Sequence, residues 1–131
     1  MITFRPIVAE EVLGALIGRD GGAVVSFTGV VRSENRGRDV LHIRYEAYES
    51  MVEREFARIV DEVRADLGVS RARAIHRVGD VAVGEASLVV GVTARHRAAA
   101  FAACGRIVDE IKHRVPIWKK EFYADGSSEW I

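Results

Sequence analysis

The chain has 131 residues, of which 49% are hydrophobic and 29% charged, with only two prolines; this composition is typical of one globular domain and excludes a disordered chain. Nineteen Lys/Arg residues balance nineteen Asp/Glu residues, which argues against the strongly basic surface of a nucleic-acid-binding domain. The single cysteine excludes an internal disulfide. Because the sequence shows neither a signal peptide nor an apolar run of about 20 residues, we expect a soluble, cytoplasmic protein.

Apolar periodicity predicts the first elements of the chain. A short strand at residues 2–4 precedes a helix over residues 8–17, where apolar residues recur at helical spacing and Gly18 provides a stop. Residues 23–31 are rich in β-branched and aromatic residues and indicate a well-buried strand.

A polar segment without periodicity, residues 32–39, follows this strand and contains Arg36 and Arg38. We expect a mobile basic loop there, and loops held by a rigid strand often carry function. Residues 40–48 alternate strictly between apolar and polar positions, which predicts a half-exposed strand.

The clearest helix spans residues 50–67, where apolar residues form a stripe at helical spacing. Ser50 and Glu53 have the spacing of a capping box at its start. Gly68 follows the last apolar position and predicts the end of the helix.

The second half of the chain predicts two strands, a helix and a further strand. The first two strands cover residues 72–78 and 86–94, the latter apolar enough to lie centrally in a sheet. A helix over residues 97–113 follows until Pro116 stops it, and residues 117–123 are again extended. The residues of this helix expected to face the core are Phe101, Cys104, Val108 and Ile111.

Residues 95–120 concentrate positive charge in an otherwise neutral chain. Seven Lys/Arg residues stand against two acidic ones there, a local net charge of +5. His96 and Arg97 open the helix, where unpaired backbone N–H groups and the helix dipole favour phosphate. The alternative is that both are solvated first-turn residues. The pattern outlines a site for a small anion.

Three lysines and one arginine are further candidates. Lys112 lies at the border of the apolar stripe, so it either reaches a cleft or extends into water as most lysines do. Lys119 and Lys120 point to opposite faces of the expected strand, so at most one readily shares a cleft with Lys112. Arg32 ends the first long strand and suits bidentate capture of a phosphate or carboxylate, although a surface arginine is the ordinary explanation.

The remaining reactive residue types predict no separate site. Cys104 shares the register of the helix's core positions, which favours packing over nucleophilic catalysis. The histidines His42, His76 and His113 have no metal-ligand spacing, so we expect no metal site. Glycine-rich phosphate motifs are absent from the sequence.

With these residues located, the sequence resembles the catalytic (large) subunit family of molybdopterin synthase along nearly its full length. The matching strings are VSFTGVVR at 25–32, YEAY at 45–48, HRVG at 76–79, HR at 96–97 with AF at 100–101, and KHRVPIWK at 112–119 continuing into Glu121. Together they are far more specific than any one of them alone.

The resemblance implies one domain over residues 1–131 with an α/β hammerhead fold and an additional antiparallel β subdomain. It implies a homodimer of this chain with one small ubiquitin-like sulfur-carrier subunit at each end, a heterotetramer. The carrier's C-terminal Gly-Gly thiocarboxylate would enter a pocket of this subunit and give sulfur to cyclic pyranopterin monophosphate. Two transfers would make the dithiolene of molybdopterin, without a cofactor, metal, nucleic acid or membrane.

The family's motifs carry roles over to matching residues. Lys112 and Lys119 are the expected catalytic lysines. The residues expected to bind or flank the substrate are Val30, Val31, Arg32, His96, Arg97, Lys120 and Glu121, with Phe27 as a wall of the pocket. Because the phosphate, the thiocarboxylate and the developing enethiolate are all negative, the chemistry requires these cations to meet in one sheltered pocket. It requires no nucleophilic cysteine on this chain.

One departure and two rival functions stay open. Relatives commonly extend beyond the segment that matches residues 125–130, and they can contribute a basic residue there to the neighbouring subunit's site. That role is missing here or is taken by Arg36 or Arg38. The rival functions are a non-catalytic phosphometabolite-binding module and a scaffold that only holds the carrier protein.

Overall fold

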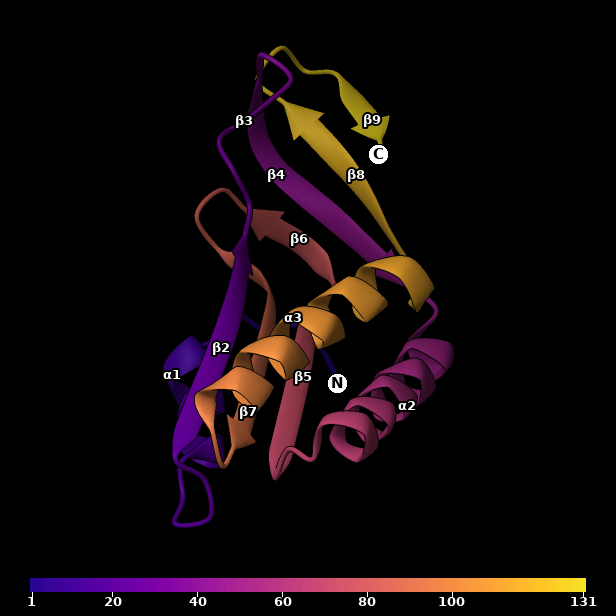
Figure 1. The fold of residues 1–131 in the computed structure, drawn as a ribbon. Helices are drawn as coiled ribbons and strands as arrows, with labels where there is room; N and C mark the ends of the chain where they lie inside the picture. The colour runs from indigo at the N-terminus through magenta and orange to yellow at the C-terminus, as the bar shows by residue number, and fades with distance from the viewer.

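The computed structural model describes all 131 residues as three helices and nine strands (Figure 1). The helices are α1 (Ala9–Leu16), α2 (Glu49–Leu67) and α3 (Arg97–Arg114). The strands are β1 (Ile2–Thr3), β2 (Ala23–Val30), β3 (Glu34–Asn35), β4 (Arg38–Ala47), β5 (Arg71–Arg77), β6 (Gly79–Ala82), β7 (Ala86–Ala94), β8 (Ile117–Tyr123) and β9 (Ser128–Trp130). One sheet has the order β1-β5-β7-β2; the other has the order β3-β4-β8-β9, with β6 also paired to β4.

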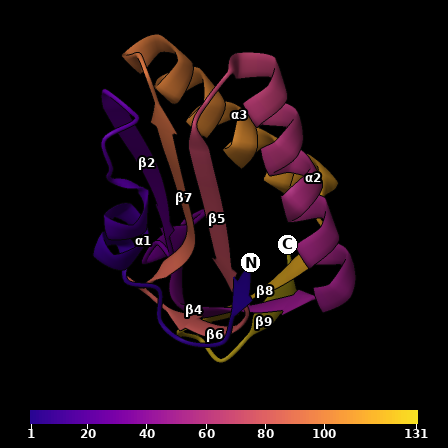
Figure 2. The ribbon, with the colours of Figure 1, turned by 90° about the horizontal axis from the view of Figure 1, so that it is seen from below.

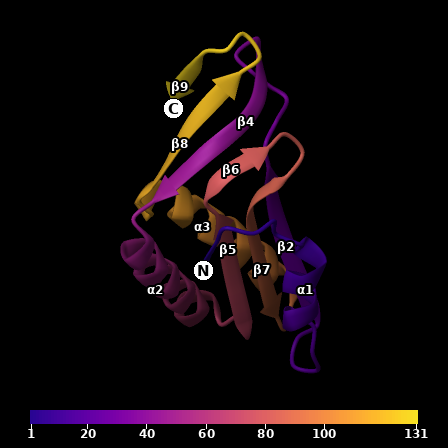
Figure 3. The ribbon, with the colours of Figure 1, turned by 180° about the vertical axis from the view of Figure 1, so that it is seen from behind.

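The helices cover both faces of the four-stranded sheet (Figures 2 and 3). Helices α2 and α3 pack on one face over a core that includes Ala74 and Val90. Helix α1 lies on the other face, where Val12 contacts the cluster of Ile75 and Val89. The two clusters use alternate residues of β5 and β7 because successive strand side chains point to opposite faces. None of the helices combines the length and the apolar character that crossing a membrane requires.

Most of the predicted element bounds are confirmed. Strands β7 and β8 cover the predicted residues, and α3 extends one residue beyond its predicted end. Gly68 ends α2 in the left-handed conformation, with φ of 65°, as expected for a glycine at this position. Val115 is extended before Pro116, so the chain turns directly from α3 into β8.

Two predictions about the helices are wrong. Phe101 does not face the core, because 64% of its surface is exposed. Ser50 and Glu53 form no capping box, since the N-cap residue is Tyr48 and no side chain caps the helix. Glu53 instead accepts a hydrogen bond of 2.6 Å from the backbone N–H of Ile2, which ties α2 to the first strand.

The basic segment after β2 is more ordered than the sequence predicts. Strands β3 and β4 form a short hairpin in which Asn35 pairs with Arg38. Arg36 and Gly37 close its two-residue turn with φ of 53° and 76°, the left-handed values that such turns need. Strand β6 was not predicted from the sequence and pairs with the other edge of β4. Together these strands complete the additional β subdomain.

His76 is a buried titratable residue within β5, with only 7% of its surface exposed. Its ring lies edge-on to Tyr45, with centroids 4.9 Å apart. Burial lowers the pKa of His76 from 6.5 to about 4, and the positive charges of Lys119, the N-terminal ammonium and Lys112 act in the same direction. The imidazole is therefore neutral at physiological pH.

We predict that the folded state loses stability as the pH falls from 6.5 towards 4. In this window the unfolded chain binds a proton at His76 that the folded chain does not bind, so the free energy of unfolding increases with pH. A pKa lowered from 6.5 to about 4 corresponds to about 3 kcal/mol at the acidic end of the window. Urea unfolding at pH 7 and pH 4.5 measures the loss, which we expect to be smaller for His76→Asn. An equal loss in both proteins would contradict the prediction.

Candidate functional site

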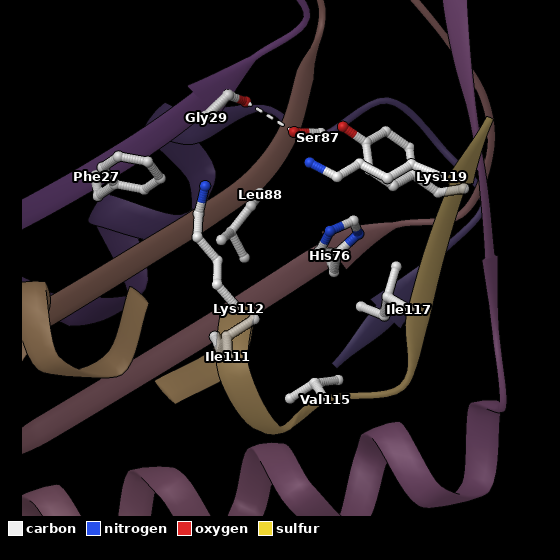
Figure 4. Close-up of a pocket in the computed structure, with 11 residues that line it drawn as sticks. Phe27, Gly29, His76, Ser87, Leu88, Ile111, Lys112, Val115, Ile117 and Lys119 are labelled. Atoms are coloured by element: carbon white, nitrogen blue, oxygen red, sulfur yellow. Dashed lines mark hydrogen bonds between the residues drawn. The ribbon is translucent and has the colours of Figure 1, made fainter. Parts of the chain in front are cut away.

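An inner cavity of about 210 Å³ lies where the end of α3 and the start of β8 meet the four-stranded sheet (Figure 4). Its lining residues are Phe27, Gly29, Tyr45, His76, Ser87, Leu88, Ile111, Lys112, Val115, Ile117 and Lys119. Five of these residues have apolar side chains, and the polar groups belong to two lysines, a histidine and two hydroxyl residues. This mixture of apolar walls and a few convergent polar groups is typical of a ligand site.

An outer cavity of about 430 Å³ adjoins the inner one and is more polar. Its lining residues are Gly29, Val30, Val31, Arg32, Asn35, Arg36, Ile43, Tyr45, Ser87, Lys112, Lys119, Glu121 and Ile131. The residues that line both cavities are Gly29, Tyr45, Ser87, Lys112 and Lys119. The two cavities therefore form one cleft, with both lysines at the junction.

The turn between α3 and β8 brings the two lysines together. Lys112 follows the buried Ile111 in the last turn of α3. Pro116 ends the helix and the chain continues at once into β8, where Lys119 pairs across the strands with Tyr45 of β4. Figure 4 shows both lysine side chains entering the inner cavity, one from each element. Neither ammonium group forms a hydrogen bond or ion pair within the chain.

The cleft makes Lys119 a better proton donor than a lysine in water. The cavity walls displace water from its side chain, and this desolvation lowers its pKa. The positive charges of Lys112 and Arg32 lower the pKa further, against an opposing effect of Glu121. A lysine with a lowered pKa suits acid–base chemistry closer to neutral pH.

Glu121 contributes a buried carboxylate to the outer cavity, with only 4% of its surface exposed. Its Oε1 accepts hydrogen bonds of 2.8 Å from the Asn35 side-chain amide and from the Tyr123 hydroxyl. These two donors fix the position of the carboxylate. Arg32 and Arg36 also line the outer cavity, which therefore presents both a hydrogen-bond acceptor and cations to a ligand.

Seven of the ten site residues expected from the sequence line this cleft: Phe27, Val30, Val31, Arg32, Lys112, Lys119 and Glu121. Lys120 lines neither cavity. Its ammonium nitrogen lies 5.6 Å from the ring centroid of Phe122 and 5.4 Å from that of Trp130, on the opposite face of β8. The alternation of strand side chains separates Lys120 from its neighbour Lys119, so the expected substrate contact of Lys120 is not supported within this chain.

His96 and Arg97 lie far from the cleft of their own chain. Both are exposed at the N-terminal end of α3, whereas Lys112 lies near its C-terminal end. At 1.5 Å per residue, Arg97 is about 22 Å from Lys112 along the helix axis. The expectation that all the cations meet in one pocket is therefore wrong for a single chain.

The two arginines of the β3–β4 hairpin have different surroundings. Arg36 lines the outer cavity. Arg38 lies over the Tyr123 ring, 3.5 Å from its centroid, and pairs with Glu129 at 3.2 Å. Arg38 thus connects the strands of the β subdomain, and only Arg36 is in position to meet a ligand in the cleft.

Three polar residues of the cavity were not predicted as site residues. Tyr45, His76 and Ser87 belong to three different strands, and the Ser87 hydroxyl donates a hydrogen bond of 3.3 Å to the Gly29 carbonyl. Strand spacing alone does not show which strands meet at a cavity. Tyr45 and His76 do occur in strings that carry the family resemblance, which was the available signal.

Cys104 is a core-facing residue of α3, with 4% of its surface exposed. Burial raises the pKa of its thiol, which disfavours the nucleophilic thiolate. The sulfur lies 3.9 Å from the Val90 carbonyl oxygen and lines neither cavity. Its surroundings are those of a packed core residue.

Comparison with known proteins identifies the family. The profile of the family described as MoaE protein matches residues 2–114. The molybdopterin synthase catalytic subunit of a Nostoc species is 41% identical over 99% of this chain and 79% of its own, and catalytic subunit 1 of Mycobacterium tuberculosis is 40% identical over 99% and 88%. The crystal structure of molybdopterin synthase from Staphylococcus aureus matches with a TM-score of 0.94 at 35% identity, over 99% of this chain and 94% of that one. This chain belongs to the MoaE protein family.

Proposed function

We propose that this chain is the catalytic subunit of a molybdopterin synthase, a cytoplasmic sulfurtransferase. It takes sulfur from the C-terminal thiocarboxylate of a small ubiquitin-like carrier and transfers it to cyclic pyranopterin monophosphate. Family membership supports the reaction class. The observation that carries the assignment is the position of Lys112 and Lys119, which line both cavities and form no ion pair within the chain.

The two cavities suit two different reactants. The inner cavity, at about 210 Å³ the smaller of the two, has Phe27, Leu88 and Ile117 among its apolar walls, and it suits a glycine tail that has no side chains. The outer cavity presents Arg32, Arg36 and the Glu121 carboxylate, which suit a phosphate and the hydrogen-bonding edge of a pterin. The thiocarboxylate and the substrate carbon then meet beside the two lysines.

The lysines supply the charge that this meeting needs. As the thiocarboxylate sulfur bonds to a substrate carbon, a carbon–oxygen bond breaks, and the leaving oxygen takes a proton from a lysine ammonium. Water then hydrolyses the thioester between carrier and substrate, which leaves a carboxylate on the carrier and a thiolate on the substrate. Preorganised cations stabilise each anion that forms, without solvent reorganisation. The lowered pKa of Lys119 makes it a better proton donor in this step than a lysine in water.

A homodimer places His96 and Arg97 of one copy at the cleft of the other. Strand β2 is an edge of its sheet and carries no charged side chain from Ala23 to Val30, so it is an unprotected edge for strand pairing. Its Ala23 end pairs with Ala94 beside His96, and its Gly29 end lines the cavities. Antiparallel pairing of two β2 strands about a two-fold axis brings the His96 end of each copy beside the cavity of the other.

The dimensions support this arrangement. Strand β2 is about 23 Å long at 3.3 Å per residue. That length matches the separation of about 22 Å between Arg97 and Lys112 along α3. The site is therefore divided between two copies, and the second copy provides the two phosphate-binding residues that a single chain lacks at its cleft.

The rival functions predict different behaviour. A phosphometabolite-binding module would bind the pterin phosphate without transferring sulfur, and a carrier scaffold would tolerate substitution of both lysines. Single-turnover incubation with thiocarboxylated carrier and cyclic pyranopterin monophosphate distinguishes them, with the dithiolene product followed by mass spectrometry. Formation of product in wild type excludes both rivals.

We predict that Lys112→Ala and Lys119→Ala each reduce the single-turnover rate by about 100-fold or more, because each removes a cation that stabilises developing negative charge. Lys120→Ala is the matched control, since this lysine is adjacent to Lys119 but faces away from the cleft. We expect it to retain nearly full activity and all three variants to bind the carrier. Wild-type turnover by Lys112→Ala would refute the catalytic assignment.

Mixed dimers test the division of the site between two copies. Arg97→Ala and Lys112→Ala are each expected to be nearly inactive alone. When the two are mixed and allowed to exchange subunits, half of the dimers contain both, and each of these has one intact site. Activity then recovers to about a quarter of the wild-type value. No recovery, despite subunit exchange shown by native mass spectrometry, would place Arg97 with the Lys112 of its own chain.

We predict that Cys104→Ala lowers stability without abolishing sulfur transfer. Loss of the buried thiol costs about 1 kcal/mol, as for other small reductions of a core side chain. The rate per folded molecule stays within about twofold of wild type because the attacking sulfur comes from the carrier. Urea unfolding and the single-turnover assay measure the two effects. A folded variant with no turnover would restore the cysteine as a candidate nucleophile.

A further inference from the structure

His76 lies on the floor of the inner cavity, and the reaction described above assigns it no role. Its strand, β5, is paired on both sides, with His76 opposite Leu88 of β7 and Ile2 of β1. Its backbone is therefore held firmly in the sheet. Figure 4 shows the ring between the two lysines and Ile117. Such a fixed polar group in the wall of the cavity suggests a function there.

The hydrogen bonds of His76 determine which ring nitrogen carries the proton. Nδ1 lies 2.7 Å from the Arg77 carbonyl oxygen, which can only accept a hydrogen bond, so the proton of the neutral ring is on Nδ1. Nε2 consequently has a free lone pair. No group of the chain donates to Nε2, yet this atom is not fully buried. It is therefore accessible from the cavity.

This nitrogen differs from the other polar side-chain groups of the inner cavity. The Tyr45 and Ser87 hydroxyls and both lysines carry protons to donate, whereas Nε2 of His76 can only accept. Both ammonium groups lack a partner within the chain. Lys119 is the candidate donor to Nε2, because it pairs across the strands with Tyr45, whose ring packs on His76.

We propose that His76 is a positioning residue of the sulfur-transfer site: a rotation of the flexible Lys119 side chain, whose ammonium has no partner in this structure, lets Nε2 accept a hydrogen bond from it and direct it to the junction of the two cavities. This inference rests on the proposed function. The hydrogen bond restricts a flexible side chain in advance of the reaction, as preorganised catalysis requires. It also satisfies one N–H donor of a partly desolvated ammonium group.

The charges around His76 keep it in the state that this role needs. The charged groups that act on it are Lys119 from β8, the N-terminal ammonium beside β5 and Lys112 from α3, while the Tyr45 ring of β4 packs against it. All three charged groups are cations, and with burial they keep the imidazole neutral. Arg32 and Glu121 act on Lys119. A neutral ring accepts a hydrogen bond from Lys119 without repelling it. Since the pKa of His76 is about 4, the lysine keeps its proton for the reaction.

Two substitutions distinguish the roles of the two ring nitrogens of His76. The shorter side-chain amide introduced by His76→Asn reaches the Arg77 carbonyl as Nδ1 does but has no acceptor at the position of Nε2, whereas His76→Gln places an amide oxygen near that position. We expect His76→Asn to lower the single-turnover rate about tenfold, the effect of losing one hydrogen bond to a charged group. We expect His76→Gln to recover most of the rate, and both variants to bind the carrier as wild type does.

The pH dependence gives a second readout that a purely structural role would not change. A hydrogen bond to Nε2 stabilises the ammonium form of Lys119, so its loss lowers the pKa of Lys119. The limb of the pH–rate profile that depends on Lys119 therefore moves to lower pH in His76→Asn and returns in His76→Gln. Equal rate losses in both variants with an unmoved limb would overturn the proposal, as would wild-type rates in both.

Spectra of the folded wild-type protein test the contact if the variants do not fold. With ¹⁵N-labelled histidine, the Nε2 signal of His76 is expected to move in Lys119→Ala and to stay in place in Lys120→Ala. An unmoved signal in both would refute the hydrogen bond. Failure of the proposed function is distinguishable, because wild type would then form no dithiolene product. If wild type and Lys119→Ala behave as expected but His76→Asn matches wild type, only the role of His76 is refuted.

Discussion

Two ammonium groups that share one cavity repel each other, and the fold has to hold them together without neutralising them. The acidic residues near the α3–β8 turn are drawn to another cation. Arg114, two residues after Lys112, pairs with Glu55, Glu62 and Glu110 at 2.5–3.3 Å. Glu55 and Glu62 belong to α2 and so tie the end of α3 to α2, and all three carboxylates leave the lysines unpaired. The core beneath both helices stabilises this arrangement through apolar burial rather than through local charge pairing.

Strand β8 separates residues by face as well as by charge. Lys119, Glu121 and Tyr123 point towards the cleft or the β-subdomain core, whereas Lys120 and Phe122 form a ladder of cation and ring on the outside. A shift of one residue in the pairing of β8 with β4 would exchange these two sets. The seven paired positions between these strands therefore fix the chemistry of the cleft as well as the subdomain.

The local features of the fold were predictable, and the features that depend on distant partners were not. The bounds of β7, β8 and α3 follow from periodicity, Gly and Pro, which act within a few residues. The exposure of Phe101 and the absence of a cap at Ser50 depend on which elements pack nearby. The cleft shows the same division: the alternation of Lys119 and Lys120 was readable, but the places of Tyr45, His76 and Ser87 required the order of strands in the sheet.

Helix α3 explains why the cations expected from one continuous segment occur in two places. Arg97 begins the helix and Lys112 lies in its last turn, so a rigid rod of about 22 Å separates them. A flexible link would let one chain fold back and bring them together, but a helix packed along its length cannot. If both residues act on the same substrate, each α3 helix serves two different clefts. The dimer is then a requirement of the chemistry, because an isolated chain carries two separate halves of a site.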